Sequence, residues 1–233
     1  MPSPNRSLLT GPPFEFETQL QFNDRRTKAA YIFDKYKALL SGRLLDVGAD
    51  QQHLAEHLKA NAEYVGVGLG GNPDIEMDLE SGRLPFDDGS FDCVLCFEVL
   101  EHLDNIHAVF DELCRVSNRY VVLSIPNAWS TFILAMFSPP NASGRSLKFY
   151  GLPPDKPEDR HKWFFSFSEA VEFVRYRSRA NGMRIRQLDT NDRQRGRRVR
   201  IKAWLLRQFL ARRITENDIF WPTLWVVLEK TQA

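Results

Sequence analysis

Two glutamates and a histidine follow an apolar run of the chain, at the point where a buried strand must end. Glu98, Glu101 and His102 come directly after Phe91–Phe97. This run is almost unbroken in apolar residues and has the length of a strand, as expected for a central strand covered on both faces by helices. Ligands of open α/β sheets bind in the crevice beyond the carboxyl ends of the strands. The two carboxylates therefore indicate a ligand site at this end of the sheet.

An aspartate and a glycine occupy the end of a second short strand. That strand is predicted over Arg43–Val47, with Asp46 near its end and Gly48 in the turn that follows. Glycine is favoured where a ligand comes close to the backbone or where φ must be positive. If the two strands are parallel neighbours, their polar ends lie side by side and form one site.

Strands and helices alternate along the chain, which argues for a parallel sheet with right-handed crossovers. The predicted strands are 43–47, 64–67, 75–79, 91–97, 119–125, 183–188 and 220–228. The predicted helices are 24–40, 51–60, 104–116 and 167–180. Residues 1–22 are rich in proline and weakly patterned, so we expect them to lie over the surface or to be mobile.

Composition is that of an ordinary globular protein of one domain. The chain has 233 residues, of which 43% are hydrophobic and 26% charged, so it can bury a full core but is short for two substantial domains. The formal charge of +1 gives no global argument for binding nucleic acid. The amino terminus lacks the apolar core of a signal peptide, and no segment approaches membrane-spanning length. We therefore expect a cytoplasmic protein.

The three cysteines do not indicate a disulfide framework or a metal site. Cys93 and Cys96 form a C-x-x-C pair, but residues three apart on a strand point to opposite faces. We expect both thiols to pack in the core, and we expect no bound metal.

The segments LPFDDGSFDCVLCFEVLEHL (84–103) and LLDVGADQQHLAEHL (44–58) resemble motifs of class I S-adenosylmethionine-dependent methyltransferases, particularly those with one small domain. The resemblance implies an α/β, Rossmann-like fold with a seven-stranded, mostly parallel sheet, helices on both faces and one antiparallel strand near the carboxyl terminus. It also implies S-adenosyl-L-methionine as cofactor. The residues at the positions of the family's cofactor site are Asp46, Gly48, Gly68, Asp78, Leu79 and Glu98.

These positions have different expected roles. The resemblance assigns Asp46 and Gly48 to the methionine end of the cofactor, and Asp78 with the amide of Leu79 to the adenine. Glu98 is expected to face the cleft. Alternatively, Asp78 caps the turn at Ser81. His102 is expected to secure the start of the following helix and not to take part in chemistry.

Three residues depart from the family motifs. Asp50 and Gln52 occupy positions of further glycines, and Gly68 replaces the carboxylate that holds the ribose hydroxyls. Asp50 is a good N-cap for the helix expected from Gln51, but its charge there would oppose the cofactor carboxylate. Asn72 or Asp74 could substitute for the missing ribose ligand, although the spacing does not demonstrate it.

The acceptor side is expected beyond the fifth strand. His161, in DRHKWFF, lies where similar enzymes present a His or Arg to the acceptor, and a histidine with a pKa near neutrality can take a proton from a hydroxyl. A structural role, packed against Trp163 or bonded to backbone, is equally open. Tyr150 and Trp163 could wall the acceptor pocket. KFYGLP together with DRHKWFF looks like bacterial methyltransferases of surface-polysaccharide and glycolipid synthesis.

The chain is thus expected to be a single domain, 1–233, in four parts. These are an amino-terminal extension and helix (1–40), a cofactor-binding half (41–127), a lid or acceptor insertion (128–165), and a carboxyl-terminal part with a helix, a basic segment and the last strands (166–233). The basic segment, 193–213, has three open interpretations: a solvated helix, a patch for phosphate-bearing or lipid-linked acceptors, or a nucleic-acid surface. We favour the first two.

Two functions compete. The first is methyl transfer to an oxygen of a small-molecule, sugar or glycolipid acceptor. The second is a catalytically impaired domain of the same fold that serves as a binding or scaffolding module, because Asp50, Gln52 and Gly68 replace expected features. A nicotinamide site is disfavoured: Gly66, Gly68 and Gly71 satisfy G-x-G-x-x-G, but that motif requires a helix directly after it.

Overall fold

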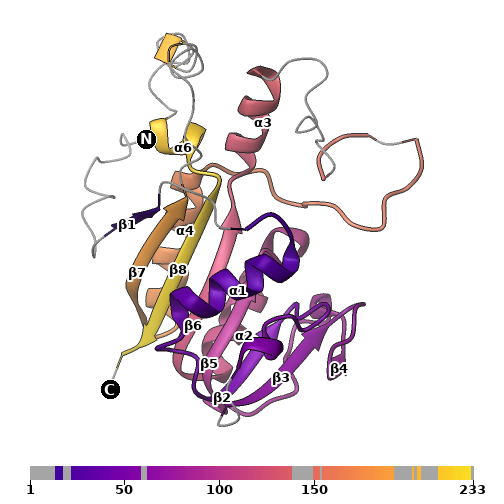
Figure 1. The fold of residues 1–233 in the computed structure, drawn as a ribbon, viewed down its shortest axis with the longest axis vertical. Helices are drawn as coiled ribbons and strands as arrows, with labels where there is room; N and C mark the ends of the chain where they lie inside the picture. Colours follow the sequence, from indigo (N-terminus) through magenta and orange to yellow (C-terminus); the bar gives the residue numbers. More distant parts are fainter. Residues whose placement is uncertain are drawn as a thin grey trace.

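A computed structural model gives the fold of the chain. It describes residues 14–17, 22–58, 62–137, 149–152, 154–191, 201, 204–205 and 215–231. Eight strands form one sheet in the order β1-β7-β8-β6-β5-β2-β3-β4 (Figure 1). The strands are β1 (Phe14–Glu17), β2 (Gly42–Val47), β3 (Ala62–Gly68), β4 (Ile75–Glu76), β5 (Phe91–Phe97), β6 (Ser117–Pro126), β7 (Met183–Asn191) and β8 (Thr223–Lys230).

The sheet is parallel except at β8. This strand is antiparallel to both of its neighbours, β6 and β7, whereas every other pairing is parallel. The predicted Rossmann-like, mostly parallel sheet with one antiparallel strand near the carboxyl terminus is therefore confirmed. The seven predicted strands are present, with ends that differ from the predicted ends by a few residues.

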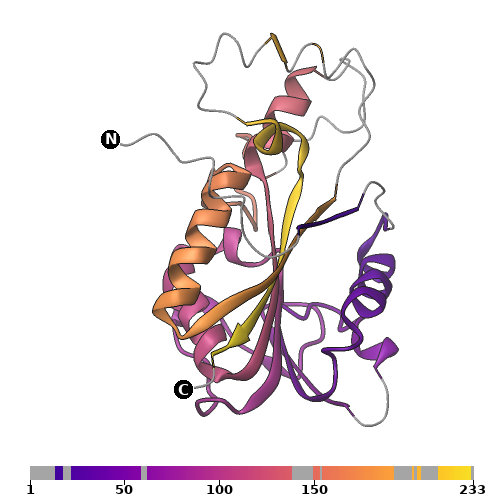
Figure 2. The ribbon, with the colours of Figure 1, turned by 90° about the vertical axis from the view of Figure 1, so that its left-hand side faces the viewer.

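Helices cover both faces of the sheet. They are α1 (Arg25–Tyr36), α2 (Ile106–Val116), α3 (Ala128–Phe137), α4 (Phe167–Ala180) and α6 (Glu216–Phe220). Figure 2 shows α1 on one side of the sheet and α4 on the other. Short 3-10 turns, η2 (Ala55–His57), η3 (Leu79–Ser81) and η4 (Leu100–His102), follow β2, β4 and β5.

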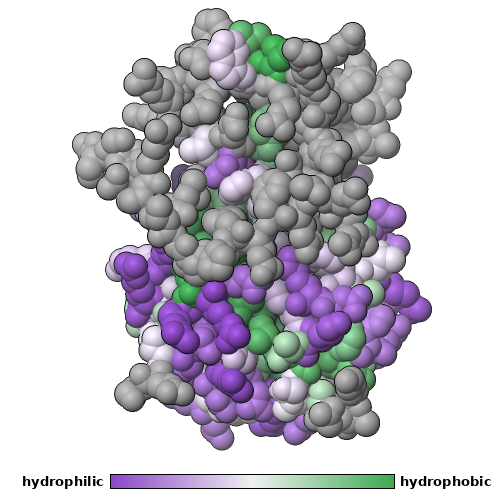
Figure 3. Space-filling model, turned by 60° about the vertical axis from the view of Figure 1, so that its left-hand side comes forward, coloured by the Kyte–Doolittle hydropathy of each residue, from purple (hydrophilic) through white to green (hydrophobic). Residues whose placement is uncertain are grey.

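The core has one layer on each face of the central strands. Because side chains alternate along β5, Cys93 packs in the cluster under α1 and Cys96 in the cluster under α2 and α4. Both thiols are free and buried, as predicted. On the face shown in Figure 3, polar residues dominate the described surface and apolar residues form a narrow band. No helix among the described residues is long and apolar enough to cross a membrane.

Two predicted features are wrong. Phe14–Glu17 lies inside the segment expected to be unpatterned, yet it forms an eighth strand at the sheet edge by pairing with β7. The helix expected over 51–60 is reduced, within the described residues, to the single turn η2. Asp50 and Gln52 have φ of 47° and 54°, and left-handed backbone at both positions prevents a right-handed helix from starting there.

The glycines of the G-x-G-x-x-G run also take part in sheet and turn structure. The chain continues from Gly71 into β4, with no helix before η3, so the nicotinamide interpretation lacks the helix it requires. Of the basic segment 193–213, only residues 201, 204 and 205 are described. The rest of the segment, on which its three interpretations depend, lies outside the described residues.

Candidate active site

A cavity of about 630 Å³ lies at the carboxyl ends of β2 and β5, and we call it the strand-end pocket. Its walls come from these strand ends, from the first turns of α1 and from parts of the segment 149–161. This volume is in the range of small-molecule sites. Four of the predicted site residues line the pocket: Asp46, Gly48, Glu98 and His161.

Gly48 is required by the close approach of the next turn. Its φ is 86°, and a Cβ atom there would lie 2.2 Å from Cγ2 of Val99. No side chain fits in that space, and an L-residue would also be strained by the backbone angle. The glycine therefore lets the turn after β2 and the turn after β5 pack together at the pocket floor.

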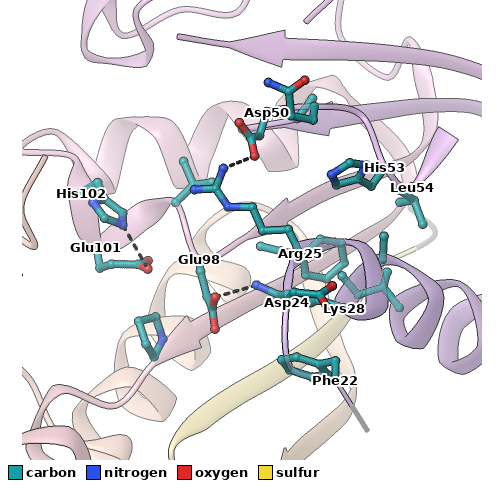
Figure 4. Close-up of a pocket in the computed structure, with 18 of the residues that line it drawn as sticks. Phe22, Asp24, Arg25, Lys28, Asp50, His53, Leu54, Glu98, Glu101 and His102 are labelled. Atoms are coloured by element: carbon teal, nitrogen blue, oxygen red, sulfur yellow. Dashed lines mark hydrogen bonds and ion pairs between the residues drawn. The ribbon is translucent and has the colours of Figure 1, made fainter. Parts of the chain in front are cut away.

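Asp50 and Gln52 keep the backbone conformation of a glycine turn while directing their side chains to specific partners. The Asp50 carboxylate pairs with Arg25 of α1, and the Gln52 amide donates to the carbonyl oxygen of Asn72 over 2.8 Å. Asp50 is not the N-cap that the sequence predicted, because no helix begins after it. Its charge faces a cation at the rim of the pocket (Figure 4).

Asp46 is a buried acid at the end of β2. The residue is 8% exposed, and the Tyr64 hydroxyl donates to its carboxylate over 2.7 Å. Burial raises the pKa of Asp46 to about 6, partly offset by the Tyr64 hydrogen bond and by the charge of Lys28. A carboxylate held in this way is positioned to receive a cationic group of a ligand.

Glu98 turns into the pocket through an unusual backbone angle. Its φ is 55°, which ends β5 abruptly, and its carboxylate receives the Lys28 ammonium over 2.6 Å. Arg25 and Lys28 are both positioned by the start of α1, where Asp24 is the N-cap in a capping box with Thr27. Figure 4 shows both cations reaching from α1 to the strand ends.

The other three predicted residues lie beyond the lining of the strand-end pocket. Asp78 accepts from the backbone amide of Glu80 over 2.9 Å and is the N-cap of η3. This is the alternative role that the sequence suggested for Asp78. Leu79 is buried in the core. Gly68 ends β3. The carboxylate of Asp74 accepts from the amide of Gly66 over 2.7 Å, so one of its oxygens has a structural partner.

Residues 159–163 are attached to the η4 turn, which brings distant parts of the sequence together. The Lys162 amide donates to the Glu101 carbonyl oxygen over 2.8 Å, and the Trp163 indole donates to the Leu103 carbonyl oxygen over 2.7 Å. The Lys162 ammonium also pairs with Glu80 and Asp104, each at 2.7 Å. Trp163 therefore holds the segment in place and is absent from the pocket lining.

His161 lies in the pocket wall in a setting that differs from both sequence interpretations. Its ring stacks on Phe149 at 4.4 Å between centroids, and Nδ1 shares a hydrogen bond of 2.7 Å with the Tyr150 hydroxyl. Burial, with the nearby His102, lowers the pKa of His161 to about 4, so the expected pKa near neutrality is not found. The imidazole is neutral at physiological pH and can accept a hydrogen bond.

Sequence reasoning missed the role of Glu101 and His102. Glu101 is 1% exposed, and burial raises the pKa of its carboxyl group well above the usual range. His102 donates from Nδ1 to Asp159 over 2.6 Å and lines the pocket; it does not merely secure the next helix. The adjacent pair Glu-His was visible in the sequence, but its proximity to His161 depends on a loop path that periodicity does not predict.

The charged groups of the pocket fit the amino-acid end of S-adenosylmethionine. Asp46 and Glu98 offer carboxylates to an ammonium or a sulfonium, and Arg25 and Lys28 offer cations to a carboxylate. Gly48 provides the close backbone approach, since a Cβ would fill the space beside it. The donor set thus matches a ligand that carries both signs of charge.

Comparisons with known proteins indicate the family and the fold of the chain. The sequence matches a family described as methyltransferase domain over residues 21–181. No curated protein matches it. Similar solved structures include a SAM-dependent methyltransferase from Archaeoglobus fulgidus, with 16% identity, a TM-score of 0.57 and coverage of 89% of this chain and 95% of that chain. Another is described as a methyltransferase from Bacillus halodurans, with 13% identity, a TM-score of 0.52 and coverage of 88% and 100%.

At these identities the structural likenesses establish the fold, and the family match over most of the chain establishes the kind of domain. The match includes the turn after β2, the end of β5 and His161. It supports the expected enzyme class. The chain belongs to the methyltransferase domain family.

Proposed function

We propose that this enzyme transfers the methyl group of S-adenosylmethionine to an oxygen of a small-molecule, sugar or glycolipid acceptor. The observation that carries the proposal is the polarity of the strand-end pocket. One part of its wall holds the carboxylates and cations suited to an amino-acid group, and another part, with Tyr150 and His161, offers hydroxyl and imidazole groups.

In this proposal, Asp46, Gly48 and Glu98 hold the methionine end of the cofactor, with Gly68, Asp78 and Leu79 along the strand ends that lead to the nucleoside. Arg25 and Lys28 orient the cofactor carboxylate. S-adenosylmethionine supplies an electrophilic methyl group on a sulfonium, which reacts by in-line displacement. The protein must therefore mainly fix the attack geometry and exclude water.

His161 and Tyr150 act on the acceptor. The neutral imidazole, fixed by its stacking on Phe149 and its hydrogen bond to Tyr150, can orient an acceptor hydroxyl. Its low pKa means that it remains unprotonated throughout the physiological range. His161 is thus suited to position an oxygen nucleophile, and less suited to hold a proton after transfer.

Thermal unfolding with and without S-adenosylhomocysteine tests cofactor binding. At one hundred times its dissociation constant, the ligand should stabilise the protein by about 2.7 kcal/mol. Gly48→Ala should abolish the shift, whereas Arg184→Ala, at the far end of the sheet in β7, should retain it. Absence of a shift in the wild-type protein at millimolar ligand would support the impaired scaffolding module instead.

The acceptor is tested with radiolabelled S-adenosylmethionine and three classes of hydroxyl compound: small metabolites, free sugars and lipid-linked sugars. Label in an alkali-stable ether would support an oxygen acceptor of that class. Labelling that occurs only on amine or thiol compounds would refute the oxygen assignment while leaving cofactor binding intact.

A further inference from the structure

Three metal-ligating side chains meet in the wall of the strand-end pocket. They are Glu101 and His102 of η4 and His161 of the segment attached to it. The Glu101 Oε1 atom lies 3.6 Å from Nε2 of His102 and 3.9 Å from Nε2 of His161, and the three ligand atoms all lie within 4.8 Å of one another. Ligands bound at about 2.1 Å to one ion are about 3.0–3.5 Å apart, so small side-chain movements would complete the site.

The second nitrogen of each imidazole already has a partner. Nδ1 of His102 bonds to the Asp159 carboxylate over 2.6 Å, and Nδ1 of His161 bonds to the Tyr150 hydroxyl over 2.7 Å. Metal-bound histidines commonly use the other ring nitrogen in this way, because the hydrogen bond fixes the tautomer and the ring orientation. In the His102 tautomer that donates from Nδ1 to Asp159, the lone pair is on Nε2, which lies 3.6 Å from Glu101 Oε1.

Glu101 provides an independent observation. Its side chain is 1% exposed, and within the described residues neither carboxylate oxygen has a hydrogen-bond partner. Buried polar groups without partners are rare and need a physical explanation. Nε2 of His102 and Nε2 of His161 lie 3.6 Å and 3.9 Å from Glu101 Oε1, too far for a hydrogen bond, whereas a cation bound between the three groups would satisfy all of them.

We propose that Glu101, His102 and His161 bind a divalent transition-metal ion in the strand-end pocket. Two imidazoles and one carboxylate favour an ion such as Zn²⁺ or Co²⁺ over Mg²⁺, which prefers oxygen ligands and retained water. Three protein ligands leave coordination positions open toward the pocket, as in catalytic metal sites.

The open position would take the acceptor, an interpretation that rests on the proposed function. An acceptor hydroxyl bound there would become more acidic and would give its proton to water. Its oxygen would then form a bond to the methyl carbon while the carbon–sulfur bond breaks. That electron pair stays on sulfur, which gives the neutral thioether. His161 would then bind the ion and would not serve as the free base considered from the sequence.

The test measures metal binding directly, with the full chain stripped by a chelator and titrated with CoCl₂ and, separately, ZnCl₂. We expect one ion per chain and a visible Co²⁺ absorption band that Zn²⁺ removes. Glu101→Gln, His102→Gln and His161→Gln should each weaken binding at least about a hundredfold, and Asp159→Asn should weaken it about ten- to a hundredfold by releasing the His102 ring. His107→Gln is the matched control, since His107 packs against Trp163 and Phe173 outside the pocket.

Two outcomes would overturn the proposal. One is the absence of stoichiometric Co²⁺ or Zn²⁺ binding to the wild-type protein. The other is metal binding that is affected equally by His107→Gln and by the variants of the ligand triad, Glu101, His102 and His161. If a triad variant does not fold, Asp159→Asn decides, because the Asp159 side chain is largely exposed. Thermal shifts with S-adenosylhomocysteine in the metal-free protein test the proposed function separately, since the cofactor groups do not include the triad.

Discussion

Asp46→Asn should make the protein more stable at neutral pH while weakening cofactor binding. Burial raises the pKa of Asp46 from 3.8 to about 6, so the folded state binds this proton more tightly than the unfolded chain does. Because the folded pKa is raised, the stabilisation from the protonated form is complete below pH 3.8 and is lost as pH rises through about 6. The difference of about two pH units corresponds to about 3 kcal/mol.

An amide at position 46 removes this pH-dependent loss and keeps an oxygen that can accept from the Tyr64 hydroxyl. The free energy of unfolding in urea should therefore be higher for Asp46→Asn than for the wild-type protein at pH 8, by up to about 3 kcal/mol. Near pH 4 the two proteins should differ much less. Calorimetry should show that the same substitution weakens S-adenosylhomocysteine binding, because one pocket carboxylate is gone.

The difference between the two proteins is the decisive quantity, since other groups titrate in both. A difference that does not change between pH 4 and pH 8 would refute the reasoning. So would a lower stability of Asp46→Asn at pH 8. Tyr64→Phe provides the control in the opposite direction: loss of the donated hydrogen bond should raise the pKa of Asp46 further and steepen the pH dependence.

Asp50→Gly should tighten binding of S-adenosylhomocysteine, measured by calorimetry. The substitution removes a carboxylate from the pocket rim, frees Arg25, and places a glycine where φ is 47°. Unchanged or weaker affinity would contradict the idea that the Asp50 charge opposes the cofactor carboxylate. Gly48→Ala should lower the free energy of unfolding by at least about 1–2 kcal/mol in urea titrations, through left-handed strain and the clash with Val99; a fully stable variant would show that the turn can rearrange.

The parts of the fold that follow from periodicity were predictable. An apolar run of strand length placed β5 at Phe91–Phe97, and helical spacing placed α1 and α4. The helix expected over 51–60 failed for a local reason. Asp50 and Gln52 both have left-handed backbone conformations. The side-chain amide of Gln52 also donates a hydrogen bond to the carbonyl oxygen of Asn72, a contact that no sequence pattern predicts.

The site was predictable where it depends on strand ends and not where it depends on loops. Asp46, Gly48 and Glu98 follow from the carboxyl ends of parallel strands, and the structure brings them into one pocket. The proximity of His161 to Glu101 follows instead from hydrogen bonds such as those of Lys162 and Trp163 to η4. These tertiary contacts link distant segments and leave no periodic signal.

The ion pairs between α1 and the strand ends have a consequence for ligand exchange. Arg25–Asp50 and Lys28–Glu98 each join a cation of the helix to an anion of the sheet. A zwitterion that enters can replace each partner by a group of the same sign, so few counterions need to move in or out. Its affinity should then vary little with salt concentration, unlike that of a purely anionic or purely cationic compound.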